Sequence, residues 1–93
     1  MFSNSYMTKG VQLKIPAVLQ IFMWDCISAV PEPADYLQIF RLSESNGKQK
    51  VVHEQELPEF KREYLLAFQN PVNAKVYVID DGDHCTMLLA EEY

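Results

Sequence analysis

The densest set of chemically capable side chains lies in one short stretch, where Asp80, Asp81, Asp83 and His84 are followed directly by Cys85. Three carboxylates and an imidazole this close together could hold a hard divalent cation. However, the calcium-loop pattern D-x-[DN]-x-[DN]-G-x5-E is not met, and aspartates favour turns through hydrogen bonds to their own backbone. We therefore expect a solvated turn with no metal, and a metal site at Asp80, Asp81, Asp83 and His84 is the alternative.

A thiol-imidazole pair would be a second kind of chemistry, but the elements that carry the residues argue against it. Adjacent residues of a strand point to opposite faces, so His84 and Cys85 cannot form a working nucleophile and base. Cys85 and Cys26 lie in apolar surroundings and are expected to be core residues. His53 could be a general base, yet spacing marks no partner for it, and a partly buried histidine at a sheet edge is expected. The sequence identifies no catalytic residue and no cofactor, and we expect a protein that is not an enzyme.

The strands that carry these residues are expected to form two tight hairpins. Asn46-Gly47 and Asp81-Gly82 favour the positive φ angles of two-residue turns. The first turn pairs Phe40 with His53 and Leu42 with Val51. One side of this hairpin then holds Tyr36, Phe40, Leu42, Val51, His53 and Leu57, and the other holds Leu37, Ile39, Arg41, Val52, Glu54 and Glu56.

The second hairpin, within residues 74–93, contains a test of its own register. A two-residue loop places Val78 opposite Cys85 and Val76 opposite Met87, so that one face is wholly apolar. Any loop of even length preserves that face, whereas an odd length breaks it. The single helix is expected to pack on this face.

One amphipathic helix is expected between Pro16 and Val30, because apolar residues recur there at helical spacing. Pro16 suits the first helical position, and Pro31 and Pro33 end the helix. Gly10 is expected in a turn before it, after a short edge strand at residues 6–8. The stretch 58–69 fits both a helical period and strand alternation, and we choose a strand from about Glu63 because the turn at 70–71 then continues a meander.

These elements predict a single α+β domain over residues 1–93, with one amphipathic helix packed on an antiparallel sheet of about five strands. Neither side of the first hairpin is cleanly polar, so part of the second face is expected to be covered by the N-terminal segment or by another copy. Which sheet face is exposed stays open.

Charge and composition exclude several function classes. The formal net charge is -5, and the eight Lys and Arg are scattered, so nucleic acids and anionic membranes are not expected partners. No apolar run approaches the length of a membrane span, and the first 20 residues lack a signal-peptide core. With only two cysteines, neither in a metal-like spacing, a cytoplasmic protein is expected.

Tyrosine is abundant for so short a chain, and tyrosine and tryptophan favour sites where one end is apolar and the other wet. Packing at the edge of the core is the other interpretation of these rings. The candidate interaction surface consists of Trp24, Tyr36, Tyr64, Tyr77 and His84.

Several motifs together resemble one protein family. They are Tyr77-Val78-Ile79-Asp80-Asp81-Gly82, Met87-Leu88-Leu89-Ala90-Glu91-Glu92-Tyr93 and Asn46-Gly47-Lys48-Gln49-Lys50. They are similar to a family of short uncharacterised proteins from staphylococci, streptococci and related Firmicutes and their phages, a domain of unknown function. The resemblance implies a bacterial cytoplasmic protein and brings no catalytic residues.

The sequence thus predicts a small acidic protein that is a non-enzymatic interaction or regulatory module. It would bind another protein or self-associate through an aromatic-rich sheet face. The alternative is an enzyme, or a protein that binds a small molecule or a metal, with its site between helix and sheet or at the turn from Asp80 to His84.

Overall fold

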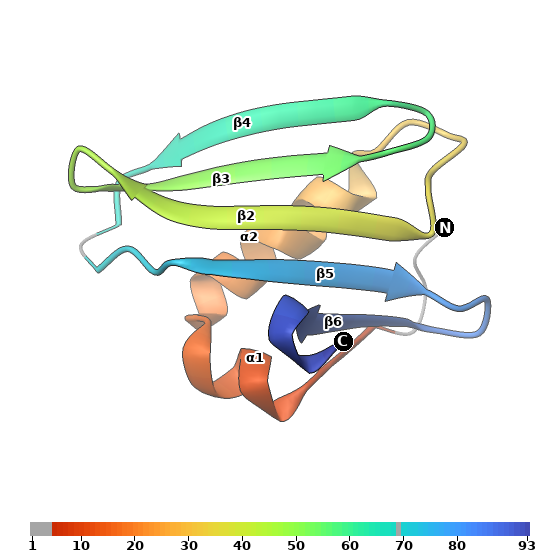
Figure 1. Ribbon diagram of the computed structural model, residues 1–93, viewed down its shortest axis with the longest axis horizontal. Helices are drawn as coiled ribbons and strands as arrows, with labels where there is room; N and C mark the ends of the chain where they lie inside the picture. Colours follow the sequence, from red (N-terminus) through yellow and green to blue (C-terminus); the bar gives the residue numbers. More distant parts are fainter. Residues whose placement is uncertain (1–4, 69) are drawn as a thin grey trace.

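The computed structural model describes residues 5–68 and 70–93, which form an α+β structure with one sheet (Figure 1). Its strands follow the spatial order β1-β6-β5-β2-β3-β4, and every neighbouring pair is antiparallel except β1 and β6. The elements are β1 (Ser5–Met7), α1 (Lys9–Lys14), α2 (Ala17–Ser28), β2 (Leu37–Ser45), β3 (Lys48–Gln55), β4 (Phe60–Leu66), β5 (Ala74–Asp80), β6 (Cys85–Leu89) and a C-terminal 3-10 turn, η1 (Ala90–Glu92).

The α+β class is as expected, but three finer expectations are wrong. Within the described residues the sheet has six strands rather than about five, it is mixed rather than antiparallel, and a second helix, α1, precedes α2. The parallel pair arises because β1 adds to β6 from the other end of the chain, with Tyr6 opposite Thr86. A strand of three residues carries too little alternation to reveal such a distant partner.

Gly10 lies inside helix α1 and not in the expected turn. The Thr8 side chain caps α1 by accepting from the Val11 N–H at 3.3 Å, and its hydroxyl donates to Glu92 Oε1 at 2.7 Å. A Cβ on Gly10 would lie 2.5 Å from Glu92 Oε2, so the carboxylate takes the space that a side chain would fill. A side chain at position 10 would therefore displace the Glu92 carboxylate from its place beside α1, a constraint that local sequence cannot show.

We expect Glu92→Ala to lower the denaturation midpoint, because it removes the acceptor of the Thr8 hydroxyl and of the Leu89 N–H, which lies 2.8 Å away. These hydrogen bonds lower the pKa of Glu92, Thr8 contributing most, so the ionised form stabilises the fold. Their contribution should be complete above the usual pKa of a glutamate and should disappear as the pH falls through the lowered value. Urea melts at pH 7 and pH 3 test this, with Glu91→Ala as the control; equal midpoints for both variants at pH 7 would refute it.

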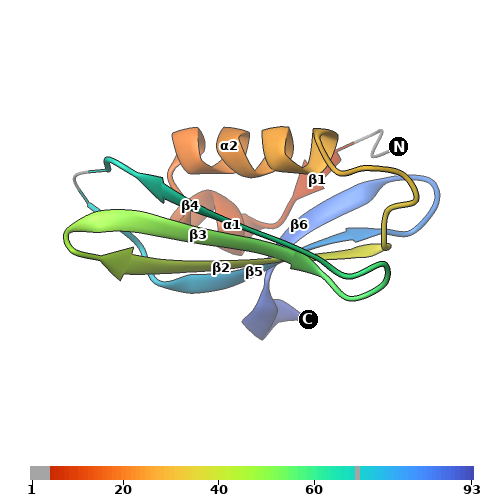
Figure 2. The ribbon, with the colours of Figure 1, turned by 90° about the horizontal axis from the view of Figure 1, so that it is seen from above.

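Helix α2 lies along one face of the sheet, as Figure 2 shows, and begins directly after Pro16, which is its N-cap and not its first helical residue. Its buried side chains are Leu19, Met23, Cys26 and Ile27. They join the apolar residues of the central strands in one core, as expected. Val18 and Ile21 point away from that core and are 57% and 61% exposed, so α2 carries apolar side chains on both sides.

The first hairpin has the expected register, with Phe40 opposite His53 and Leu42 opposite Val51. Asn46 and Gly47 have φ angles of 51° and 77°, the left-handed conformation that a tight turn between β2 and β3 requires. Alternation grouped Tyr36 and Leu57 with the residues that face α2, but these two side chains are 59% and 79% exposed because they lie beyond the ends of β2 and β3.

The second hairpin keeps the expected apolar face, but its expected register is wrong by two residues. Val78 lies opposite Met87 and Asp80 lies opposite Cys85, so residues 81–84 form the loop. The Asp81 N–H donates to the His84 carbonyl at 3.0 Å, and the Asp81 carboxylate accepts from the His84 N–H at 3.1 Å. These bonds favour the wider loop, and its even length preserves the buried face.

Strand β4 resolves the ambiguous stretch, because residues 60–66 form a strand on the edge of the sheet. The strand begins at Phe60, three residues before the expected start at Glu63. Tyr64 lies opposite Val51, and its ring packs edge-on against Phe22 of α2 at a centroid distance of 5.1 Å. The edge strand is therefore anchored to the helix.

Candidate binding face of the sheet

The sheet face turned away from α2 is called the outer face below. Alternation places every second strand residue on it, and η1 lies on this side of the sheet (Figure 2). Ile39, Tyr77 and Leu88 form one row across it, since Ile39 lies opposite Tyr77 and Tyr77 lies opposite Leu88. Leu37 lies opposite Ile79 in the adjacent row. These five partly exposed residues form a continuous apolar area, called the outer patch.

Cations gather beside the outer patch. The outer positions of β2 to β5 carry five cations and two carboxylates, a surplus of three positive charges in a chain with a formal net charge of -5. The cations are Arg41, Lys48, Lys50, Lys61 and Lys75, and the carboxylates are Glu54 and Glu63. The sequence indicated scattered charges, whereas the pleat of the sheet collects most of the positive ones on one face.

Ion pairs neutralise only part of this charge. Arg41 pairs with Glu54, and Glu63 lies 3.6 Å from the Lys50 Nζ and 3.8 Å from the Lys61 Nζ. Lys75 lies directly opposite Arg41, an arrangement of like charges that destabilises a strand pair. Its Nζ lies over the Tyr77 ring at 5.4 Å, and in the described part of the chain no carboxylate pairs with it. The outer face therefore holds positive charge that an acidic group could neutralise.

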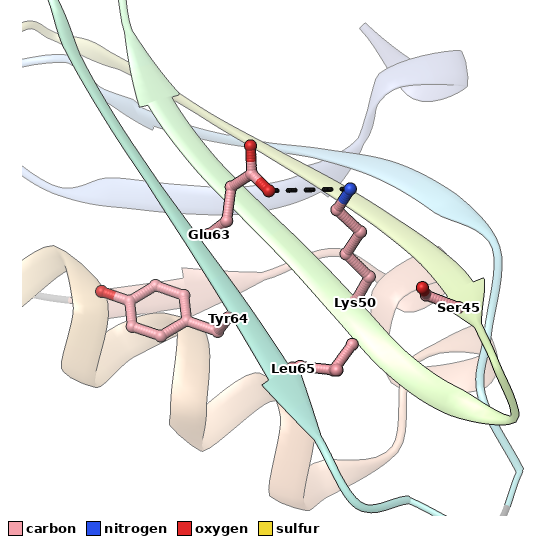
Figure 3. Close-up of a pocket in the computed structure, with 5 residues that line it drawn as sticks. All are labelled: Ser45, Lys50, Glu63, Tyr64 and Leu65. Atoms are coloured by element: carbon pink, nitrogen blue, oxygen red, sulfur yellow. Dashed lines mark ion pairs between the residues drawn. The ribbon is translucent and has the colours of Figure 1, made fainter.

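A shallow hollow of about 270 Å³ lies at the β4 end of this face, lined by Ser45, Lys50, Glu63, Tyr64 and Leu65. Figure 3 shows Lys50 and Glu63 reaching toward each other across β3 and β4, with Leu65 beside them. The lining offers an ion pair and an aliphatic side chain, but no nucleophile next to a base.

The five residues of the expected interaction surface do not form one surface. Tyr77 lies in the outer patch, and the Tyr93 ring packs edge-on against it at 5.5 Å. His84 lies in the 81–84 loop, where its ring meets that of Tyr6 at 5.2 Å. Trp24 and Tyr64 belong to the opposite side, where both pack against the core, and Tyr36 is exposed just before β2. The aliphatic members of the outer patch were missed as site residues, although strand alternation already placed Leu37 and Ile39 on the second face.

The carboxylates of the acidic loop serve the turn. Asp80 Oδ1 accepts from the Gly82 N–H at 2.9 Å, and Asp81 Oδ2 lies 3.2 Å from His84 Nε2. Among residues 5–68 and 70–93, no three His, Cys, Asp or Glu side chains are grouped as a metal site requires. The Asp80 and Asp81 carboxylates thus bond to groups of their own loop.

Both cysteines are buried, and burial raises the pKa of each thiol. Since the thiolate is the reactive form, burial and a raised pKa are expected to slow the reactions of both thiols at neutral pH. We expect the native protein at pH 7.5 to take up almost no iodoacetamide at Cys26 or Cys85 over an hour, and both to react in 6 M guanidinium. Intact-protein mass spectrometry measures the adducts, and rapid alkylation of the native protein would contradict the assignment of both residues to the core.

His53 lies in a buried polar network and is fully buried, not partly buried at a sheet edge as expected. Its Nε2 lies 2.7 Å from Gln38 Oε1, and Gln38 Nε2 donates to Gln55 Oε1 at 2.7 Å. Because Gln38 Nε2 also donates to the Asp35 carbonyl, Gln38 Oε1 must accept, and His53 must carry its proton on Nε2. Its Nδ1 has no hydrogen-bond partner among the described residues, and its ring stacks on Phe40 at a centroid distance of 4.3 Å.

Comparisons with known proteins agree with the resemblance and name no activity. The model of a family described as "Staphylococcal protein of unknown function (DUF960)" matches residues 4–92. The crystal structure of a protein of unknown function from Enterococcus faecalis is similar, with a TM-score of 0.85 and 27% identity over 97% of this chain and 90% of that one. No match is found among curated proteins. No helix in the described residues is both long and apolar enough to cross a bilayer.

Proposed function

This chain belongs to the DUF960 family of staphylococcal proteins of unknown function, and from that premise we propose that it is a non-enzymatic module that binds another protein through its outer face. One observation carries the proposal: a continuous apolar patch lies in the middle of a sheet face that α2 does not cover. Apolar patches rimmed by polar residues are typical of protein-binding surfaces.

The chemistry of the remaining groups supports a binding role over a catalytic one. The two thiols are buried with raised pKa values, and His53 is enclosed in the glutamine network. The hollows found on the described surface are shallow and bring no nucleophile next to a base. The buried cysteines also support a reducing compartment, and we place the protein in the cytoplasm.

Charge argues against a second copy as the partner on this face. Two outer faces packed together would oppose their positive surpluses, and like charges across an interface cost free energy. We therefore expect a monomer of 10.8 kDa in light scattering at 10 to 100 μM protein and physiological salt. A stable dimer whose mass reverts to the monomer with Ile39→Glu would show instead that the face binds its own copy.

A second apolar surface competes with the outer face. Val18 and Ile21, three residues apart on α2, are both more than half exposed, as is Leu13 of α1. A helix that is apolar on both sides is commonly covered on both. This surface lacks the segregated charge and the continuous cross-strand rows of the outer patch. It provides a matched control for every test of the proposal.

The test compares Ile39→Glu, at the centre of the outer patch, with Ile21→Glu on the exposed side of α2. Each variant introduces one carboxylate in place of an isoleucine, so the change in net charge is the same. We expect capture of the partner from native-host extract to weaken by at least about 30-fold for Ile39→Glu, as for a hot-spot residue, and by less than about 3-fold for Ile21→Glu. Circular dichroism checks that both variants fold.

The opposite order of losses would assign the interface to α2 and refute the proposal. Equal capture by both variants and the unchanged protein would show that neither surface binds, with the same consequence.

A further inference from the structure

Resting on the proposed function, we propose that the partner presents an acidic segment, with carboxylates placed around an apolar centre that contacts the outer patch. The outer positions of the strands hold five of the eight cations of the chain and two of its thirteen carboxylates. The positive surplus therefore belongs to the strand positions of the outer face, and η1, which carries Glu91 and Glu92, lies on the same side of the sheet. Complementary charge on the partner would steer the encounter and fix the register of the complex.

The pair of cations Arg41 and Lys75 gives the most specific evidence for an acidic partner. They lie directly opposite each other on β2 and β5, where like charges destabilise the pair. Among residues 5–68 and 70–93, Arg41 pairs with the Glu54 carboxylate, whereas Lys75 pairs with no carboxylate and its Nζ lies over the Tyr77 ring. A carboxylate of the partner set between the two cations would remove their repulsion and gain two charge-assisted contacts.

The spacing between charge and apolar centre follows from the strand register. Arg41 and Lys75 lie two residues along their strands from Ile39 and Tyr77, which form the centre of the outer patch. Two strand residues span about 7 Å. An extended partner segment with an apolar or aromatic residue at one position and Asp or Glu two positions away would match this spacing.

The same surface suits nucleic acid less well. Binding of single strands depends on aromatic faces on which bases stack. The Tyr77 ring is already occupied by Lys75 and by the edge contact with Tyr93, and the rest of the outer patch is aliphatic. Leu37, Ile39, Ile79 and Leu88 offer nothing to a phosphate or a base edge. The observations therefore favour an acidic polypeptide.

The test is a selection of random 12-residue peptides displayed on phage against the immobilised full-length protein, with counter-selection against the Ile39→Glu variant. Enriched peptides are synthesised with a fluorescent label, and their affinities are measured by anisotropy. Arg41→Gln/Lys75→Gln removes two charges from the outer face. The matched control, Lys9→Gln/Lys14→Gln, removes two charges from α1. A labelled 15-nucleotide single strand, rU15, is measured in parallel.

We expect the enriched peptides to carry a negative mean charge with an apolar residue two positions from an acid. Their affinity should fall about fivefold in the outer-face variant, stay within about twofold in the control, and weaken as salt rises. Neutral or basic peptides that still require Ile39 would overturn the acidic partner and leave the proposed function standing. An absence of peptides that require Ile39 would overturn both, and tighter binding of rU15 with the same sensitivity would replace the acidic polypeptide by nucleic acid.

Discussion

The free energy of unfolding is expected to fall by about 3 kcal/mol between pH 6.5 and pH 4 through His53 alone. Burial, with a smaller contribution from Arg62, lowers the pKa of this imidazole from 6.5 to about 4. In that window the unfolded chain binds a proton that the native state does not. The stabilisation is therefore complete above pH 6.5, declines as the pH falls, and is level again below pH 4.

Urea melts at half-unit steps from pH 7.5 to 4.5 measure this dependence, and His53→Leu provides the comparison. The variant should lose the slope above pH 5 whatever its stability at pH 7. Carboxylates with lowered pKa values, such as Glu92, lose their contribution mainly below about pH 5, so the two proteins are compared above that pH. Parallel pH profiles for the two proteins would contradict the assignment of a neutral, buried His53.

Replacing Gln38 by methionine, a residue of similar size and greater hydrophobicity, should cost about 3 kcal/mol. Gln38 is fully buried and joins His53 to Gln55 and to the Asp35 carbonyl. The substitution leaves the His53 donor and the Asp35 carbonyl without their partner. Leaving a buried polar group without a partner costs more free energy than an average hydrogen bond contributes. The Gln38→Met protein should therefore be less stable, although methionine is the more apolar residue.

Leu42→Met on the same strand face is the control, because it conserves volume and breaks no hydrogen bond, and it should cost less than about 1.5 kcal/mol. The double variant Gln38→Met/His53→Leu should lose less than the sum of the single losses, because it removes both partners of one bond. Chemical denaturation at pH 7.5 gives all four values. A Gln38→Met variant as stable as Leu42→Met would show that the network contributes nothing.

Features that depend on neighbouring residues could be predicted from the sequence. Asn46-Gly47 dictates its turn through positive φ angles, and so the register of β2 and β3 followed correctly. At Asp81-Gly82 the preference of an Asp-Gly dipeptide for a two-residue turn is not followed, because the Asp81 carboxylate accepts from the His84 N–H in a four-residue loop. The buried face was still predicted correctly, because side chains alternate with a period of two and the register differs by two residues.

Features that join distant parts of the chain could not be predicted. The parallel pairing of β1 with β6 and the contact of Glu92 with Thr8 and Gly10 connect opposite ends of the sequence. The buried glutamines were within reach, since Gln38 shares its face with Phe40, and Gln49 with Val51. Because glutamine is polar, Gln38 and Gln49 interrupt the apolar-polar alternation by which inward-facing residues are recognised. Each side chain nevertheless makes hydrogen bonds inside the protein.

The sequence predicted part of the candidate binding face. Alternation placed Leu37, Ile39 and Arg41 together on the second face of the first hairpin. In the other hairpin it sends Tyr77, which lies between the inward-facing Val76 and Val78, to the opposite side. What the sequence could not show is that β5 lies beside β2, which joins the two halves and sets Lys75 opposite Arg41. Cations far apart in the chain thereby become one charged surface.

The most direct test of the outer face as the binding surface is photo-crosslinking in the native host. The photoreactive amino acid p-benzoylphenylalanine is placed at position 39, in the outer patch, or at position 21, on the exposed side of α2. A specific crosslink to a host protein from position 39, and none to that protein from position 21, is the predicted result. Crosslinks from position 21 alone, or crosslinks from position 39 only to this chain itself, would contradict it.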